Sequence, residues 1–253
     1  MGKATFLKYD KPTLTVMVQG NTPEHVLKLM EKGHALGGEA FGIQTEGLKP
    51  EYQNPDVYRR LIDAAKGLPT YVTNYRREEN GFDDDTLAQG LLTLADCGAT
   101  LCDVMGDMFC RHPQELTEDA AAIEKQMRLI DALHEKGAEV LMSSHVLKYA
   151  SAERVLEIGL EQQRRGADIV KIVTFADNRE QELENLRICH LLKEALSVPF
   201  LFLAGGECTL HRRIGGSLGC CMYLCVAEHD EFSTKSQPLL SKMKAIRDNL
   251  EWA

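Results

Sequence analysis

The sequence predicts an α/β protein of the (β/α)8 TIM-barrel class, folded as a single domain over residues 1–253. Short apolar runs alternate with longer amphipathic segments, a pattern typical of parallel β/α units. Eight such units fit within 253 residues, a usual length for one closed barrel. No linker, low-complexity tract or change in composition divides the chain, so no second domain is expected.

The first four units follow one another without long gaps. Thr22 is a plausible N-cap for the first helix, because its hydroxyl can accept a backbone N–H and Glu24 follows in the first turn. Pro69 leads into the third strand. The strands are expected at 13–19, 40–45, 70–75 and 100–105, and the helices at 22–36, 54–66, 84–97 and 117–136.

The second half continues the alternation. In the segment 178–196, apolar residues recur at helical spacing, which predicts one buried face. No G-x-G-x-x-G follows the first strand, which disfavours a dinucleotide-binding sheet. The strands are expected at 139–144, 168–174, 199–203 and 220–226, and the helices at 151–165, 178–196 and 237–250.

Composition and charge limit the kinds of molecule that the protein is expected to bind. A net charge of -9 disfavours nucleic acid and anionic membrane surfaces, although a local arginine cluster can still bind an anionic small molecule. No run of eighteen apolar residues predicts a membrane span, and the first ten residues lack an apolar signal core. The expected location is therefore cytoplasmic.

The eight cysteines are interpreted as reduced thiols. Cys220, Cys221 and Cys225 lie in an apolar run and are expected in the core. Cys208 and His211 lack the further partners of a recognisable zinc set, so no metal is expected.

Lys171 and His145 are the candidate catalytic residues. Lys171 lies in the apolar run DIVKIVT, where burial disfavours the ammonium and favours a neutral amine able to attack a ketone. A lysine that reaches solvent or pairs with a carboxylate fits the local pattern equally well. His145 ends the preceding strand, on the side expected to face Lys171, where it could transfer protons.

Two arginines are candidates for binding a substrate carboxylate or phosphate. Arg213 follows the seventh strand in HRRIGG, and Arg76 follows the third strand in TNYRREENG. Both are expected at the carboxyl end of the barrel, where such barrels hold their sites. Their neighbours Arg212 and Arg77 are interpreted as surface charges, and Gly215-Gly216 as an alternative phosphate loop.

These segments resemble the type I 3-dehydroquinate dehydratase family. GADIVKIVTFADNREQELENL resembles its Schiff-base strand and following helix, and EVLMSSH resembles its histidine-bearing strand. HRRIGG, LGCC and STKSQP resemble its closing elements. The resemblance extends over nearly the whole chain and is clearest over 139–238.

The resemblance implies roles for individual residues. It makes Lys171 the imine-forming lysine, His145 the general acid and base, and Arg213 the anchor for the substrate carboxylate. The other matched positions are Arg76 on the third strand, Asp103 on the fourth, and the polar pair Ser233 and Gln237 on a loop that closes over substrate.

The chain departs from the family at several positions. The second-strand Glu-x-Arg-x-Asp is replaced by Gly42, Gln44 and Glu46, so Gln44 becomes the candidate substrate contact there. The glutamate that pairs with the histidine matches Asn80, with Glu78 and Glu79 nearby. Val146 replaces an aspartate, and Lys235-Ser236 replaces the Pro-Gly of the closing loop.

The resemblance implies dehydration of 3-dehydroquinate to 3-dehydroshikimate through a lysine Schiff base, without a cofactor. The replaced second-strand residues leave two alternatives open. One is a Schiff-base lyase or aldolase for another keto acid, and the other is a non-catalytic barrel that binds a carboxylate. In each case the partner is a small carboxylate or keto compound. The family often forms dimers, so a homodimer is consistent with the resemblance.

Overall fold

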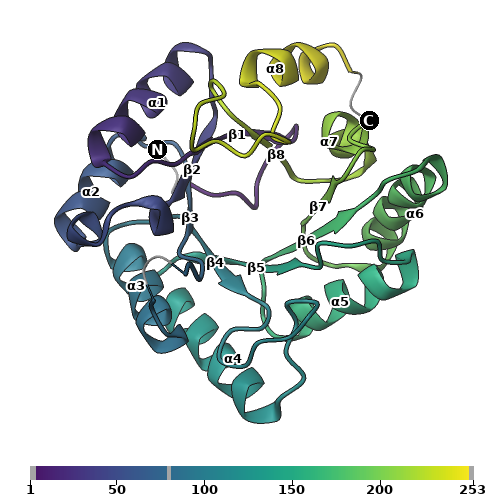
Figure 1. The fold of residues 1–253 in the computed structure, drawn as a ribbon, viewed down its shortest axis with the longest axis horizontal. Coiled ribbons are helices and arrows are strands. Elements are labelled where there is room, and N and C mark those ends of the chain that lie inside the picture. The colour runs from purple at the N-terminus through teal and green to yellow at the C-terminus, as the bar shows by residue number, and fades with distance from the viewer. Residues whose placement is uncertain (1–3, 79–80, 251–253) are drawn as a thin grey trace.

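The chain folds into a barrel of eight parallel strands surrounded by helices (Figure 1), which confirms the expected class. The computed structural model describes residues 4–78 and 81–250. The strands are β1 Thr13–Val18, β2 Ala40–Gln44, β3 Thr70–Thr73, β4 Leu101–Met105, β5 Glu139–His145, β6 Ile169–Phe175, β7 Phe200–Gly205 and β8 Met222–Cys225.

Each strand pairs in parallel with its neighbour in the chain from β1 to β7, and β8 pairs with β1. The ring closes through a parallel bridge between Phe200 and Cys220, next to a 2.9 Å hydrogen bond from the Cys221 N–H to the Phe200 carbonyl. This single bridge at the start of β7 brings the two ends of the sheet together, so the barrel is nearly closed.

The helices lie outside the strands. The larger ones begin at side-chain caps: Thr22, Asn54, Asp83, Asp119, Ser151 and Asn178 each accept a backbone N–H of the first turn. The helices are α1 Pro23–Ala35, α2 Pro55–Asp63, α3 Asp84–Asp96, α4 Ala120–Glu135, α5 Ala152–Arg164, α6 Arg179–Ala195, α7 His211–Ile214 and α8 Leu240–Asp248.

Three differences from the predicted elements affect the site. The short helix α7 and the 3-10 helix η3, Gly215–Leu218, lie where only a loop was expected. The strand expected over 70–75 ends at Thr73, and the closing helix expected from residue 237 begins at Leu240. Two further 3-10 turns, η1 Thr45–Gly47 and η2 Pro50–Tyr52, follow β2.

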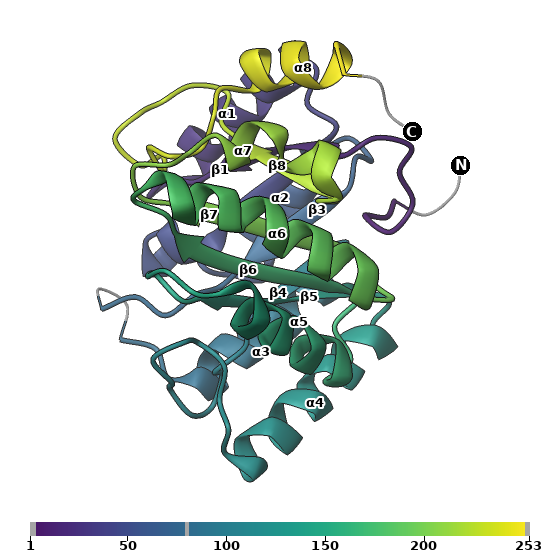
Figure 2. The same ribbon diagram turned by 90° about the vertical axis from the view of Figure 1, so that its right-hand side faces the viewer.

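Figure 2 shows long loops gathered at one end of the strands. One of them, residues 226–239, joins β8 to α8, and we call it the lid loop. The Gln19 side-chain amide donates to the Phe232 carbonyl, and His25 Nε2 lies 2.9 Å from the Asp230 carboxylate. The lid loop is therefore held against the ends of β1 and α1.

Along the described part of the chain, no helix is both long and apolar enough to cross a membrane.

Candidate active site

A cavity of about 280 Å³ lies at the carboxyl ends of the strands, beneath the lid loop. Lys171 and His145 both line it, as predicted from sequence. The register pairs Ser143 with Lys171 and His145 with Val173, so the lysine and the histidine lie on the same face of adjacent strands. The remaining wall is largely apolar, with Met17, Leu147, Val173, Phe175, Leu203 and Leu224 among its lining residues.

The Lys171 amine is buried in a network of polar groups, with only 4% of the residue exposed. Its Nζ lies 2.9 Å from the Tyr71 hydroxyl, 2.8 Å from the Tyr75 hydroxyl and 3.1 Å from the Asp103 carboxylate. Both tyrosines donate their O–H to Asp103 Oδ2, and Ser143 donates to Oδ1 at 2.6 Å. The nitrogen thus has three partners that fix its position.

The two tyrosines stay protonated in this setting. Burial, followed by the neighbouring Asp103 carboxylate, raises the pKa of Tyr71 and of Tyr75 well above the ordinary value. Both phenols can therefore donate to the carboxylate while they accept from the lysine. Sequence analysis missed both residues.

His145 is oriented by Glu115, which lies on the loop between β4 and α4. Glu115 Oε2 lies 2.5 Å from both the ring Nδ1 and the backbone nitrogen of His145. A carboxylate on Nδ1 leaves Nε2 for proton transfer. The expected partner position, Asn80, and the adjacent Glu79 lie outside the described residues.

The guanidinium in the cavity belongs to Arg212, which corrects the choice of Arg213. Arg213 is exposed, and its Nη1 donates to the carbonyl and hydroxyl of Thr209 at 3.1 Å each. Arg212 lines the cavity and spends one donor, Nε, on the Ala204 carbonyl at 2.7 Å. Burial lowers the pKa of Arg212 to about 10, and none of the carboxylates in the described chain forms a salt bridge with it.

Arg76 does not line the cavity, contrary to the sequence-based expectation. Its Nε and Nη2 bind the two Asp84 oxygens at 2.6 and 2.7 Å, and its Nη1 binds Asp107 at 2.6 Å. These carboxylates raise the Arg76 pKa, against the opposing effect of its burial. Two ion pairs leave this guanidinium committed to holding the loops together, and Tyr75, one residue earlier, faces the cavity instead.

Comparison with known proteins assigns the chain to a protein family. The family model described as type I 3-dehydroquinase matches residues 14–251. The chain belongs to the type I 3-dehydroquinase family. A curated 3-dehydroquinate dehydratase of Alkaliphilus oremlandii (strain OhILAs) is 32% identical over 106 residues, a region that spans 41% of this chain and 40% of that relative.

Solved structures of this family share the fold. Type I 3-dehydroquinate dehydratase from Clostridium difficile superposes with a TM-score of 0.80 at 16% identity, covering 96% of this chain and 93% of the other. The 3-dehydroquinate dehydratase from Geobacillus kaustophilus HTA426 gives 0.79 at 17% identity, with 94% and 91% covered.

The lid loop of this family member supplies Gln237 to the cavity, as expected. Ser233 instead closes a turn: its hydroxyl accepts the Asp230 N–H at 2.9 Å and donates to the Asp230 carbonyl at 3.1 Å. Ser233 is absent from the cavity lining, where Thr234 and Ser236 appear. The polar lid contacts therefore lie one and three residues beyond the expected serine.

The second strand explains how this dehydroquinase-family chain tolerates its departures. A Cβ on Gly42 would lie 2.2 Å from the Met17 sulfur and 3.2 Å from Tyr71, so these two side chains fill the space above the glycine. Gln44 lines the cavity as expected. Glu46 is buried and accepts hydrogen bonds from Thr73 at 3.0 and 2.8 Å, and its burial raises its pKa.

The alternative phosphate loop at Gly215-Gly216 does not form. Both glycines are buried within η3. A Cβ on Gly216 would lie 2.5 Å from the Tyr223 hydroxyl, and one on Gly215 would lie 3.1 Å from the His211 ring. The glycines thus allow close packing behind β8 and offer no open anion cradle.

Proposed function

We propose that the chain dehydrates 3-dehydroquinate to 3-dehydroshikimate through a Schiff base at Lys171. One observation carries the proposal: the cavity that buries the Lys171 amine is also lined by Arg212, whose guanidinium forms no salt bridge with any described carboxylate. A keto acid offers one group to each. Membership of the type I 3-dehydroquinase family supports the same substrate.

Imine formation begins at the Lys171 nitrogen. Asp103, 3.1 Å away, is the nearest base and takes one ammonium proton, leaving a neutral amine that attacks the ring ketone. The carbinolamine loses its hydroxyl as water to give a protonated imine. Tyr75, 2.8 Å from the same nitrogen, is placed to donate to that departing oxygen and to relay its proton.

Elimination then depends on His145. The protonated imine withdraws electrons from the adjacent carbon, and His145 Nε2 removes the proton on that carbon to leave an enamine. The enamine expels the β-hydroxyl group, which takes the proton back from His145 and departs as water. Hydrolysis of the imine consumes one water and returns the Lys171 amine, so the cycle removes one water from the substrate in total.

Binding of the substrate rests on charge and hydrogen bonds around the cavity. Arg212 receives the carboxylate by charge-assisted bonds. Gln44 and Gln237 each bury an amide oxygen that has no hydrogen-bond partner among the described residues. Such oxygens need donors, and the hydroxyl groups of a polyhydroxylated ring supply them.

A second candidate is a Schiff-base lyase or aldolase for a less hydroxylated keto acid. The wall formed by Met17, Tyr71 and Gly42 favours it, because the family's second-strand acid is replaced there by a thioether and an aromatic ring. A non-catalytic carboxylate-binding barrel is the third reading. Both keep Arg212 as the carboxylate anchor.

Borohydride trapping distinguishes these three candidate functions. Incubation with 3-dehydroquinate and borohydride should add the reduced substrate or product to the peptide that contains Lys171, and dehydroshikimate should accumulate without borohydride. Lys171→Met should abolish both, whereas the exposed control Lys148→Met should retain them. Trapping of other keto acids alone favours the second candidate, and no adduct with any carbonyl favours the third.

We also propose a cytoplasmic location, since all eight cysteines are free. Assembly as a homodimer stays a prediction from the family resemblance.

A further inference from the structure

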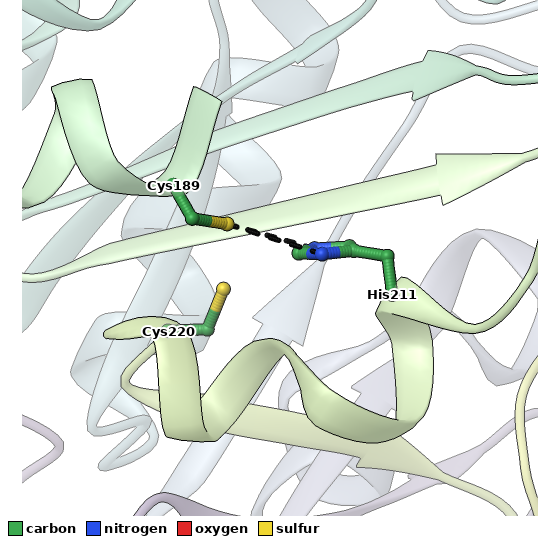
Figure 3. Close-up of side chains that lie close together, drawn as sticks. All are labelled: Cys189, His211 and Cys220. Carbon is green, nitrogen blue, oxygen red and sulfur yellow. Dashed lines mark hydrogen bonds between the residues drawn. The ribbon is translucent and has the colours of Figure 1, made fainter. Parts of the chain in front are cut away.

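Three side chains from distant parts of the sequence converge behind β7, outside the catalytic cavity. Cys189 comes from α6, His211 from the start of α7, and Cys220 from the segment before β8 (Figure 3). All three are buried, and their sulfur and nitrogen atoms lie within 4.8 Å of one another. The proposed dehydration uses none of them.

The histidine is already in the form that a metal ligand needs. Its Nε2 lies 2.8 Å from the Phe202 carbonyl, which can only accept, so Nε2 carries the proton and Nδ1 keeps its lone pair. A metal-bound histidine usually donates its second ring N–H to a carbonyl or carboxylate in this way.

The distance between donor atoms also fits a metal ion. The Cys189 sulfur lies 3.9 Å from His211 Nδ1 and 4.0 Å from Nε2. Zinc bonds of about 2.3 Å to sulfur and about 2.0 Å to nitrogen, set at a tetrahedral angle, separate the two ligand atoms by about 3.5 Å. Contraction by a few tenths of an ångström, with a rotation of the side chains that turns the Nδ1 lone pair toward the ion, would let both atoms bind one ion.

Space for a further ligand adjoins the cluster. A small cavity of about 10 Å³, enough for one water molecule, is lined by His211, Cys220 and Tyr223. The buried Tyr223 hydroxyl has no hydrogen-bond partner in the described chain and could bond that water. Gly215 keeps the space open, because a Cβ there would lie 3.1 Å from the ring and 3.4 Å from the Cys220 sulfur.

We propose that Cys189, His211 and Cys220 form a structural site for one Zn²⁺ ion, with a water molecule as the fourth ligand. Two thiolates cancel the charge of the ion, so the complex is neutral and can be buried at this apolar position. Two soft sulfurs and one imidazole favour zinc over magnesium or calcium. This site differs from the sequence-based expectation of no metal, which considered His211 only with Cys208.

The proposed zinc site lies next to a residue that lines the catalytic cavity. His211 begins α7, and Arg212 is the next residue. An ion bound to His211, Cys189 and Cys220 would tie the start of this four-residue helix to α6 and to the entrance of β8. The ion would thereby fix the position of Arg212, whose guanidinium faces the substrate.

Cobalt titration tests the site, since Co²⁺ occupies zinc sites and absorbs visibly. The full chain is reduced, stripped with a chelator and titrated with Co²⁺, then with Zn²⁺. We expect one equivalent of Co²⁺ with tetrahedral d–d bands and a sulfur-to-cobalt charge-transfer band, both bleached by one equivalent of Zn²⁺. Zn²⁺ should also raise the melting temperature.

Matched variants locate the ligands. Cys189→Ala and Cys220→Ala should each lose the charge-transfer intensity and the stoichiometric binding, whereas Cys221→Ala and Cys208→Ala should keep both. Absence of a charge-transfer band in the wild-type chain would overturn the proposal even if a variant fails to fold. A band that survives in both ligand variants would also overturn it, as would a thiol count two below the eight in the chain, which would reveal a disulfide instead.

Discussion

Replacement of Arg212 by glutamine tests the proposed anchor against the one expected from sequence. Five N–H donors belong to an arginine, and Arg212 spends one on the Ala204 carbonyl, so four remain for a carboxylate. A buried, charge-assisted pair of this kind contributes about 3 kcal/mol, which corresponds to roughly a 100-fold change in affinity or rate. We expect Arg212→Gln to lower kcat/KM for 3-dehydroquinate by that factor.

The neighbouring Arg213 provides the matched control. Its guanidinium is exposed and bonds Thr209, so Arg213→Gln should change kcat/KM by less than about 2-fold. Steady-state assays of dehydroshikimate formation measure both. The Arg212 variant should melt no lower than the wild type, because it removes a half-buried charge that no carboxylate in the described chain balances. A large loss in the Arg213 variant with none in the Arg212 variant would refute the assignment.

Three further changes probe other parts of the cavity. Tyr75→Phe removes a hydroxyl 2.8 Å from the lysine nitrogen and should slow borohydride-trapped imine formation by about 10-fold or more; an unchanged trapping rate would remove Tyr75 from the mechanism. Glu115→Gln should lower kcat by about 100-fold with little change in KM, since it weakens the orientation of His145, and an effect on KM alone would contradict that role. Glu46 has a raised pKa because it is buried, so the native chain holds its proton more tightly than the unfolded chain, and stability falls as pH rises from the ordinary value of 4.5 through the native value. Urea unfolding should therefore show that Glu46→Gln gains stability over the wild type at about pH 8 and loses this advantage below about pH 4.5; an equal gain at both pH values would contradict the ionisation argument.

The fold could be predicted from sequence because each strand is a short apolar run and each longer helix is an amphipathic segment. Helix α6, Arg179–Ala195, lies within the predicted range and buries Ile188 and Leu192, whereas Leu183 and Leu186 of the same apolar pattern are exposed. Helix α7 escaped prediction, because four residues are too short to show a helical period. Its register then decided which of two adjacent arginines faces the cavity, and the sequence alone contains no signal for that choice.

The third strand did contain a usable signal. Side chains alternate between the two faces of a strand, and Tyr71, Thr73 and Tyr75 share one face. All three line the cavity, whereas Asn74 on the other face donates to the Leu87 carbonyl in α3. Alternation alone therefore favours Tyr75 over Arg76 as the residue that faces the lysine.

Glu115 could not be predicted from sequence. It lies 30 residues before the histidine that it orients, on a loop with no periodic pattern. Its backbone adopts a φ of 48°, a left-handed conformation that is uncommon for glutamate. Only the packing of the loop against β5 brings its carboxylate to His145, so the pairing emerges at the level of tertiary structure.

The contact between Met17 and Gly42 constrains how this site could change through mutation. A Cβ at position 42 would lie 2.2 Å from the Met17 sulfur, so an acidic residue there requires the Met17 side chain to shift or become smaller. Replacing Met17 alone by a smaller residue would enlarge the cavity and lower the free energy of unfolding, but the protein would still fold. The two positions are therefore coupled: a side chain at position 42 requires the Met17 side chain, which borders the cavity, to move or to be replaced by a smaller one.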